Sequence, residues 1–271
     1  MDPDDPRIAV FRDIRERDIT GRNGFIAEGS VVLDQLALSE RFRPSAVLVL
    51  RNRLEGIAER LQRLPADCPI YLTERNVIDR IAGFPMHRGV LAHGIDRMPE
   101  RSALKVLDGA RRRPGPVLLA AGIANHDNMG ALFRNARAFG VSAMLIDETS
   151  CNPLYRKALR VSVGTVLTED WCRAGNADQL VTAVDEAGYT PIALTPKAEH
   201  TLADLDPTER FALVVGAEGP GLPEAILRRM RGLRIAMEPD VDSLNVATSA
   251  AIVLSRLYEA RRPVSIPAGI S

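Results

Sequence analysis

The sequence predicts an α/β protein made of two regions in which short apolar strands alternate with amphipathic helices. Two observations support this fold class. The apolar runs at 117–121 and 143–146 are strand-sized and almost free of polar residues, as in a parallel sheet covered on both faces. Helix-length segments separate successive apolar runs, which favours a parallel sheet. A chain of 271 residues is long enough for one large domain or two smaller ones.

The first region extends from about residue 24 to residue 93. Phe25-Ile26-Ala27 leads into an apolar series that predicts an amphipathic helix, formed by Val31, Val32, Leu33, Leu36 and Leu38. The elements expected after it are a buried β-branched strand at 46–50, a helix at 54–64, a strand at 69–73, a short helix at 77–81 and a strand at 89–93.

A polar, basic connector follows, at about residues 97–115. Prolines near both of its ends mark a domain boundary, and a short helix is expected inside it at about 102–107. Arg111-Arg112-Arg113 forms its most basic stretch and is a candidate for contact with phosphate groups.

The second region begins with the strand at 117–121. Asn128 suits the N-cap of the next helix, and Gly140 suits the C′ position after it. The elements expected after it are a strand at 143–146, helices at 154–163 and 178–186, strands at 191–195, 211–216 and 233–237, and a final helix at 245–261.

The composition excludes several classes of protein. No apolar run reaches the length of a membrane span, and the acidic start Met1-Asp2-Pro3-Asp4-Asp5 is unlike a secretory signal. Cys68, Cys151 and Cys172 are odd in number and widely spaced, so they predict neither a disulfide framework nor a metal site. We therefore expect a cytoplasmic protein without a bound metal or membrane contact.

The formal net charge is zero, so the overall charge does not indicate a nucleic-acid partner. Arginine supplies nearly all of the positive charge, because lysine occurs only at positions 105, 157 and 197. Two explanations remain open at this point. A GC-rich genome favours arginine codons, and the planar guanidinium group suits contacts with phosphate.

Three short motifs in the second region carry the candidate chemistry. Asn128-Met129-Gly130, with Arg134, lies at the start of a predicted helix; taken alone it is a capped helix with a surface arginine. Residues 215–221, Val-Gly-Ala-Glu-Gly-Pro-Gly, form a glycine-rich loop after a strand. The spacing of its glycines differs from that of the dinucleotide-binding motif and of the P-loop. Taken alone, this loop is a structural turn. Ser243-Leu244-Asn245-Val246 precedes a helix rich in small residues, and taken alone is a helix N-terminus.

Together and in this order, the three motifs resemble those of the SpoU (TrmH-type) RNA ribose methyltransferases of the SPOUT superfamily, over roughly residues 115–262. The resemblance implies a parallel sheet whose C-terminal part, about 211–253, is tucked into a trefoil knot, and it implies a homodimer with the final helix near the interface. The first region is similar to the L30e-like α/β modules that bind structured RNA. The domains expected are 1–97 (L30e-like), 98–114 (linker) and 115–271 (methyltransferase).

The resemblance also implies S-adenosylmethionine as cofactor and a ribose 2′-oxygen of structured RNA as methyl acceptor. It assigns the chemistry to Arg134, Asn128, Glu218, Ser243 and Asn245, with Arg134 beside the ribose. It assigns cofactor binding to Thr195, Gly216, Glu218, Gly219, Ile235, Met237 and Leu244. The expected substrate is 23S ribosomal RNA; transfer RNA, or a non-catalytic role in RNA binding or ribosome assembly, are the alternatives.

Two features of the sequence stand apart from these assignments. Asn125 and His126 occupy positions where many family members have Asp-Pro, and His126 is expected to be a hydrogen-bonding loop residue rather than an acid–base catalyst. Several arginines near the N-terminus are candidates for RNA contact or for a solvated surface: Arg7, Arg12, Arg15, Arg17 and Arg22.

Overall fold

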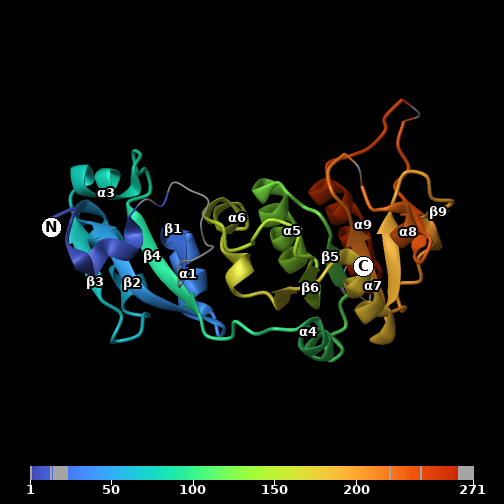
Figure 1. Cartoon of the computed structure of the whole chain (residues 1–271), viewed down its shortest axis with the longest axis horizontal. Helices are drawn as coiled ribbons and strands as arrows, with labels where there is room; N and C mark the ends of the chain where they lie inside the picture. Colours follow the sequence, from blue (N-terminus) through green and yellow to red (C-terminus); the bar gives the residue numbers. More distant parts are fainter. Residues whose placement is uncertain (1, 13, 15–23, 220, 239, 262–271) are drawn as a thin grey trace, which may run out of the picture. The chain divides into compact units, whose positions relative to one another are not determined.

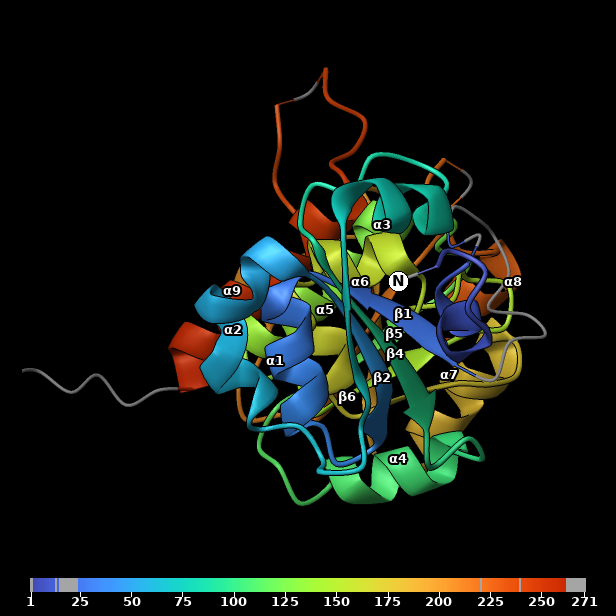
Figure 2. The same ribbon diagram turned by 90° about the vertical axis from the view of Figure 1, so that its left-hand side faces the viewer.

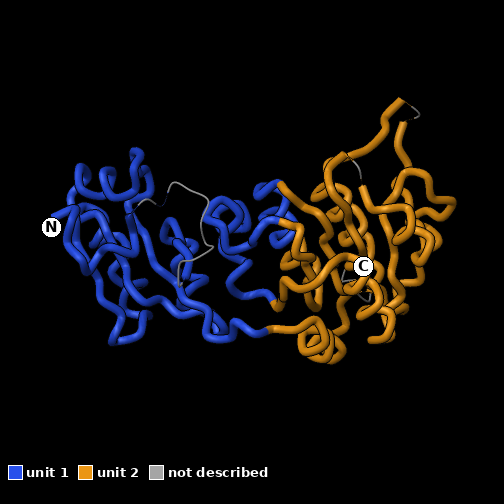
Figure 3. The backbone as a smooth tube through the Cα atoms, viewed as in Figure 1, with its two compact units in different colours: residues 1–100, 125–134, 151–169 blue, residues 101–124, 135–150, 170–271 orange. Residues whose placement is uncertain are grey.

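The computed structural model describes residues 2–12, 14, 24–219, 221–238 and 240–261. The chain forms two compact units (Figure 3). Unit 1 comprises residues 1–100, 125–134 and 151–169, and unit 2 comprises residues 101–124, 135–150 and 170–271. Each unit has its own β-sheet, and the helix α5 (His126–Ala138) begins in unit 1 and ends in unit 2.

Unit 1 contains a four-stranded sheet with the strand order β1-β4-β2-β3. Its elements are η1 (Pro6–Phe11), β1 (Phe25–Glu28), α1 (Ser30–Leu38), β2 (Phe42–Leu50), η2 (Arg51–Arg53), α2 (Leu54–Leu61), β3 (Ile70–Thr73), α3 (Arg75–Ala82), β4 (Val90–Asp96), α6 (Arg156–Val161) and η3 (Thr165–Leu167). Strand β4 is antiparallel to both β1 and β2, whereas β2 and β3 are parallel. The sheet of unit 1 is therefore mixed.

Helices cover both faces of this sheet (Figure 2). Ala46, Leu48 and Leu50 of β2 face a core completed by η1 and α3, through Phe11 and Ile78 among others. The alternate side chains of β2 point the opposite way. Helix α1 contacts β1, β2 and β4, and α2 packs on α1. The buried apolar residues of α1 are Val32, Leu33 and Leu36.

Unit 2 contains a seven-stranded sheet with the order β7-β6-β5-β10-β8-β11-β9 (Figure 1). Its elements are α4 (Ala103–Ala110), β5 (Val117–Ala120), β6 (Ala143–Ile146), β7 (Trp171–Arg173), α7 (Ala177–Glu186), β8 (Thr190–Leu194), β9 (His200–Thr201), η4 (Leu202–Asp204), β10 (Phe211–Val215), α8 (Glu224–Leu227), β11 (Arg231–Arg234) and α9 (Val246–Arg261). All six strand pairs are parallel, which confirms the predicted α/β class with a parallel sheet.

The centre of the unit 2 sheet is buried on both faces. Every residue of β5, β6 and β10 is buried, as the apolar runs predict. One face packs against α4, α7 and α8, and α9 contacts β10. This burial leaves the ends of the strands as the places where loops and side chains can meet a ligand.

Several predictions about local structure are wrong. Helix α5 begins at His126, so Asn128 is its third residue and not its N-cap. The predicted strand 233–237 is β11 (Arg231–Arg234), so Ile235 and Met237 follow the strand. Residues 25–28, for which no element was predicted, form a strand of their own before α1. On α1, Val31 and Leu38 are 48% and 66% exposed and lie off the buried face.

Candidate active site

The candidate site is at the carboxyl ends of the central strands of unit 2. Strands β5, β10, β8 and β11 are neighbours in that order and all run in the same direction. Their chain continues into residue 121, Gly216, Thr195 and Ile235, respectively. The backbone N–H of Thr195 donates to the carbonyl of Leu233 at 3.0 Å, which joins the ends of β8 and β11. Three residues predicted to bind a cofactor therefore follow adjacent strands.

The glycine-rich loop after β10 folds back on itself. Ala217 and Gly221 form an antiparallel bridge, and the Gly221 N–H donates to the carbonyl of Ala217 at 3.0 Å. A Cβ atom at Gly216 would lie 2.7 Å from the backbone nitrogen of Leu222, so glycine is needed there for the loop to close. Gly219 has φ +96°, and a Cβ atom there would meet nothing within 4 Å. The motif's Pro220 lies outside the described residues.

The described part of this loop is open at its tip. Gly219 and Glu218 are exposed, and a Cβ atom at Gly219 would have open space around it beyond its chain neighbours. Ile235, which directly follows β11, is half-buried, as is Met237 two residues later, and Leu244 is 38% exposed in the segment before α9. At the sheet edge, backbone polar groups at Thr195, Gly216 and Gly219, the Glu218 carboxylate and apolar Ile235 fit S-adenosylmethionine in chemical character.

A buried carboxylate, missed by the sequence reasoning, holds the loop between β5 and α5. Asp147 is 3% exposed and accepts hydrogen bonds from the Gly122 N–H (2.9 Å), the Ser150 N–H (3.0 Å) and Ser150 Oγ (2.6 Å). Ser150 Oγ in turn accepts from the Ile123 N–H at 2.9 Å. A Cβ atom at Gly122 would lie only 3.1 Å from that of Ala217, so this loop is adjacent to the loop after β10. Asp147 and Ser150 thus fix one wall of the candidate site.

The first motif lies on α5, where its two polar residues have different environments. Asn128 is buried, at 8% exposure, whereas Arg134 is exposed. A separation of six residues turns the helix through about 600°, so the two side chains leave it on different faces. The capping role expected for Asn128 belongs to Asn125, whose side chain accepts from the Asp127 N–H at 2.7 Å. The expected C′ glycine is confirmed, since Gly140 has φ +64° and the Val141 N–H donates to the carbonyl of Ala136.

His126 lies in the first turn of α5 beside a charged pair. Its ring centroid is 4.0 Å from that of Tyr155, and Lys157 forms an ion pair with Asp127 at 2.7 Å. Burial, and then the positive charge of Lys157, lower the pKa of His126 below its ordinary value of 6.5. The neutral ring is therefore favoured at neutral pH, which agrees with a packing role for this residue.

The third motif precedes α9. Asn245 Oδ1 accepts from the N–H groups of Ala247 (2.9 Å) and Thr248 (3.3 Å), so this side chain caps the helix. Asn135 Nδ2 donates to the Ala247 carbonyl at 2.8 Å and ties the last turns of α5 to the start of α9. Ser243 is exposed. The motif thus has a defined structural role, in addition to the cofactor contact that the sequence implies.

The arginines predicted to contact RNA have varied surroundings. Arg7 pairs with Asp5, and Arg12 donates to the carbonyl groups of Pro3 and Asp5. Three others lie outside the described residues: Arg15, Arg17 and Arg22.

Among the described residues, no group of three histidine, cysteine, aspartate or glutamate side chains lies close enough to hold a metal ion. None of the helices in the described part of the chain is both long and apolar enough to cross a membrane.

Comparison with known proteins identifies the family. The model of the SpoU rRNA Methylase family matches residues 115–255, a little over half of the chain. Over 96% of its length the chain is 39% identical to the uncharacterized tRNA/rRNA methyltransferase Rv0881 of Mycobacterium tuberculosis, of which it covers 90%. It is 27% identical, over 80% of its length and 85% of the relative's, to the 23S rRNA (guanosine-2′-O-)-methyltransferase RlmB of Coxiella burnetii.

A solved structure shares the fold. The SpoU methyltransferase AviRb of Streptomyces viridochromogenes, in complex with the cofactor AdoMet, matches with a TM-score of 0.80 at 18% identity, over 94% of this chain and 98% of that chain. With the family model matching over half of its length, the chain belongs to the SpoU rRNA methylase family.

Proposed function

We propose that this protein transfers a methyl group from S-adenosylmethionine to a ribose 2′-hydroxyl of 23S ribosomal RNA. It is an RNA methyltransferase of the SpoU family. The observation that carries the proposal is the edge of the unit 2 sheet, where Thr195, the Gly216 loop and Ile235 follow adjacent parallel strands. Ligands of open α/β sheets bind at this end of the strands. The similarity to RlmB, named for 2′-O-methylation of 23S rRNA, supports the substrate.

The proposed cofactor contacts come from the two loops and the apolar residues of that edge. Thr195, Gly216 and Gly219 would hold the cofactor through backbone groups, and Ile235, Met237 and Leu244 would contact its adenine. When bound, S-adenosylmethionine supplies an electrophilic methyl group. Glu218 and Ser243, both exposed at the ends of their loops, would orient the polar part of the cofactor.

Arg134 is the proposed activator of the ribose. Its side chain is exposed, and a guanidinium group carries a positive charge. A fixed positive charge beside the 2′-hydroxyl favours the alkoxide that attacks the methyl carbon, because opposite charges attract strongly where water is excluded. Asn128 and Asn245 would support this geometry from the helix starts that they occupy.

We extend the proposal to the architecture that the family resemblance implies. The chain would form a trefoil knot over about residues 211–253, and β10, inserted between β5 and β8, is compatible with such a crossing. Residues 1–97 would be an L30e-like RNA-binding domain, 98–114 a linker and 115–271 the methyltransferase domain. The protein would act as a homodimer, in the cytoplasm where ribosomal RNA is modified.

The decisive experiment maps ribose methylation in 23S rRNA and transfer RNA from cells with and without the gene. Complementation with the wild type is expected to restore one missing 23S methyl group, and Arg134→Ala is not. If the methyl group is missing from transfer RNA instead, transfer RNA is the substrate.

Calorimetry with S-adenosylmethionine separates binding from chemistry. Arg134→Ala is expected to lower the rate of transfer at least about 100-fold, the scale of one lost electrostatic contact, while the cofactor Kd changes little. Arg137→Ala, also exposed on α5, is the matched control and should retain activity. Equal loss of affinity and rate in Arg134→Ala would contradict a ribose-side role, and a folded wild type that binds no cofactor would contradict the proposed function.

A further inference from the structure

Val163 has a backbone conformation that its side chain disfavours. Its φ is +50°, and among the described residues it is the single one other than glycine with a positive φ. For a residue that branches at Cβ this left-handed conformation is an outlier, because Cβ lies too close to the following carbonyl oxygen. Such strain persists where the surrounding structure imposes it, and it gathers at functional sites.

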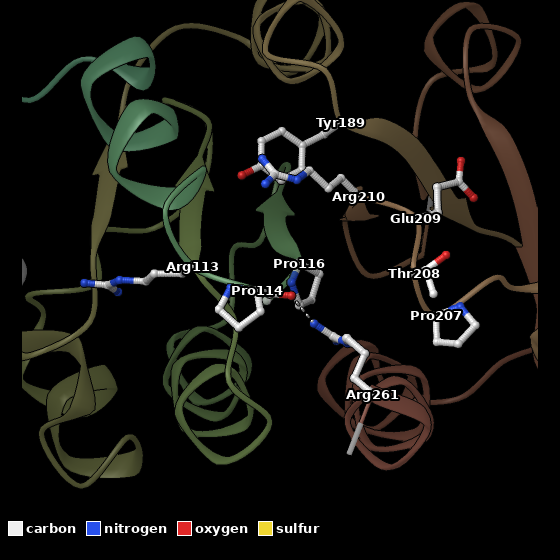
Figure 4. Close-up of a pocket in the computed structure, with 10 residues that line it drawn as sticks. Arg113, Pro114, Pro116, Tyr189, Pro207, Thr208, Glu209, Arg210 and Arg261 are labelled. Carbon is white, nitrogen blue, oxygen red and sulfur yellow. Dashed lines mark hydrogen bonds between the residues drawn. The ribbon is translucent and has the colours of Figure 1, made fainter. Parts of the chain in front are cut away.

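The strain arises where α6 ends. The N–H groups of Val163 and Gly164 donate to carbonyl groups of α6, at 3.2 and 2.9 Å. The two bonds form a Schellman motif in which Val163 occupies the C′ position, where glycine is usual. Helix α7 ends in the same motif with Gly188 at C′, and the next residue, Tyr189, packs in the apolar core beside the pocket of Figure 4.

The residues on both sides of Val163 are fixed, whereas its own side chain is open to solvent. Ser162 has no exposed surface, and its Oγ donates to the carbonyl of Leu159 at 3.0 Å. Gly164 lies against α1, since a Cβ atom there would be 2.8 Å from that of Gln35. Val163 itself is 36% exposed. Glycine adopts this conformation without strain, so packing does not explain a valine here.

This turn lies on the side of α5 that carries Arg134. The end of α6 meets α5 at Gly130, where a Cβ atom would lie 2.8 Å from that of Val161 and 3.1 Å from the backbone nitrogen of Ser162. Residues four apart on a helix share a face, so Arg134 belongs to the face that meets α6. A helical side chain leans over the preceding turn, which directs Arg134 toward the end of α6. Val163 is therefore an exposed apolar side chain near the proposed activator of the ribose.

The helix before this turn carries an excess of positive charge. Its three cations, Arg156, Lys157 and Arg160, are paired with two carboxylates, those of Glu28 and Asp127. The side chains of Lys157 and Arg160 are 48% and 40% exposed. An apolar side chain beside exposed cations suits RNA, which has anionic phosphates next to sugars and bases with apolar faces.

We propose that Val163 contacts the RNA substrate, by packing on the sugar or base of a nucleotide that lies beside Arg134. This inference rests on the proposed function and adds a residue that selects the substrate. The left-handed turn is retained, despite its strain, because it presents the valine side chain to the RNA. Val163 takes no part in the chemistry, so it affects the affinity for RNA and leaves the rate of transfer at saturating RNA unchanged.

The test measures transfer by the full-length protein from labelled S-adenosylmethionine to total RNA from cells that lack the gene. Val163→Gly is expected to raise the KM for RNA about fivefold, the scale for one partly exposed valine side chain, with kcat and the cofactor Kd unchanged. Val163→Ile keeps a branched apolar side chain and should retain the KM of the wild type. Val10→Ala shortens a valine of η1 that is 39% exposed, and this matched control should also behave like the wild type.

Thermal melting separates this role from a structural one. Val163→Gly is expected to melt at no lower temperature than the wild type, because the relief of left-handed strain offsets the greater freedom of glycine in the unfolded chain. A lower melting temperature would overturn the proposal, because the valine would then be retained for stability. A changed oligomeric state in light scattering would also overturn it, since the side chain would then contact a second copy of the chain.

The activity of the wild type distinguishes failure of this inference from failure of the proposed function. If the wild type methylates the RNA and Val163→Gly has the same KM, the contact with Val163 is refuted and the proposed function stands. If the wild type methylates none of the RNA, the proposed function fails and this inference fails with it.

Discussion

Replacing Asp147 by alanine is expected to lower the free energy of unfolding by about 1–2 kcal/mol. The substitution removes the acceptor of the Gly122 backbone N–H, at 2.9 Å, and one of the two acceptors of the Ser150 N–H, which also donates to the Asp147 backbone carbonyl at 3.2 Å. A buried donor left without an acceptor costs roughly 1–3 kcal/mol, and the Gly122 N–H, only partly buried, is at the low end. The Ser150 hydroxyl loses less, because the Ala120 carbonyl lies 3.5 Å away as an alternative acceptor.

Urea denaturation followed by circular dichroism measures this effect, with two variants for comparison. Asp147→Asn keeps an acceptor oxygen and should lose no more than about 1 kcal/mol. Glu148→Ala changes the exposed carboxylate next to it and should stay within about 0.5 kcal/mol of the wild type. A loss below about 0.5 kcal/mol in Asp147→Ala would refute the reasoning, because the Gly122 N–H would then have found another acceptor. Cofactor affinity should also fall in the folded Asp147→Ala protein, since the Gly122 loop lies against Ala217.

Three other predictions concern the helices that carry the motifs. Gly130→Ala should lower the free energy of unfolding by about 1–3 kcal/mol, because the new Cβ would lie 2.6 Å from a backbone oxygen of α6. Gly56→Ala on α2 is the control: its Cβ meets nothing within 4 Å, so the free energy of unfolding should rise by about 0.5–1 kcal/mol. Urea denaturation measures both changes. Asn245→Ala should lower the free energy of unfolding by about 1 kcal/mol, because the helix cap is lost, whereas Asn245→Asp keeps the cap. Weaker cofactor binding in both variants would show that Asn245 also contacts the cofactor. Because the pKa of His126 is lowered in the folded protein, the unfolded chain takes up a proton more readily, and the free energy of unfolding decreases as the pH falls below about 6.5. His126→Gln should make this decrease shallower between pH 7 and pH 5. Parallel curves of stability against pH for the variant and the wild type would contradict the lowered pKa.

The sequence predicted the strands whose burial is complete. The runs at 117–121, 143–146 and 211–216 correspond to β5, β6 and β10, because a strand covered on both faces must be apolar along its whole length. The helix before Gly140 and the final helix were also predicted, since each combines helical spacing with an identifiable end. These features depend on local pattern, and local pattern is what a single sequence contains.

Features that depend on tertiary contacts were missed or misplaced. Trp171–Arg173 forms β7 with three residues, too few for a periodic pattern. Asn125 and Asn128 are equally suitable as caps by residue type, and only the folded structure shows that the Asn125 side chain accepts from the Asp127 N–H. The hydrogen bond from the Gly122 N–H to Asp147 joins positions 25 residues apart, so no local rule could have paired them.

The order of the strands explains why the candidate cofactor residues meet. In the chain β8 precedes β10, and β11 follows; in the sheet β10 lies between β5 and β8, with β11 on the far side of β8. Parallel strands place all their carboxyl ends at one edge, so the motifs alone indicated the edge. The motifs did not indicate which strands lie next to one another in the sheet. Because β10 pairs with β5, the glycine-rich loop lies beside the loop that Asp147 fixes, and because it also pairs with β8, the same loop lies beside Thr195. One inserted strand thus brings the glycine-rich loop, the loop held by Asp147 and the end of β8 together at one edge of the sheet.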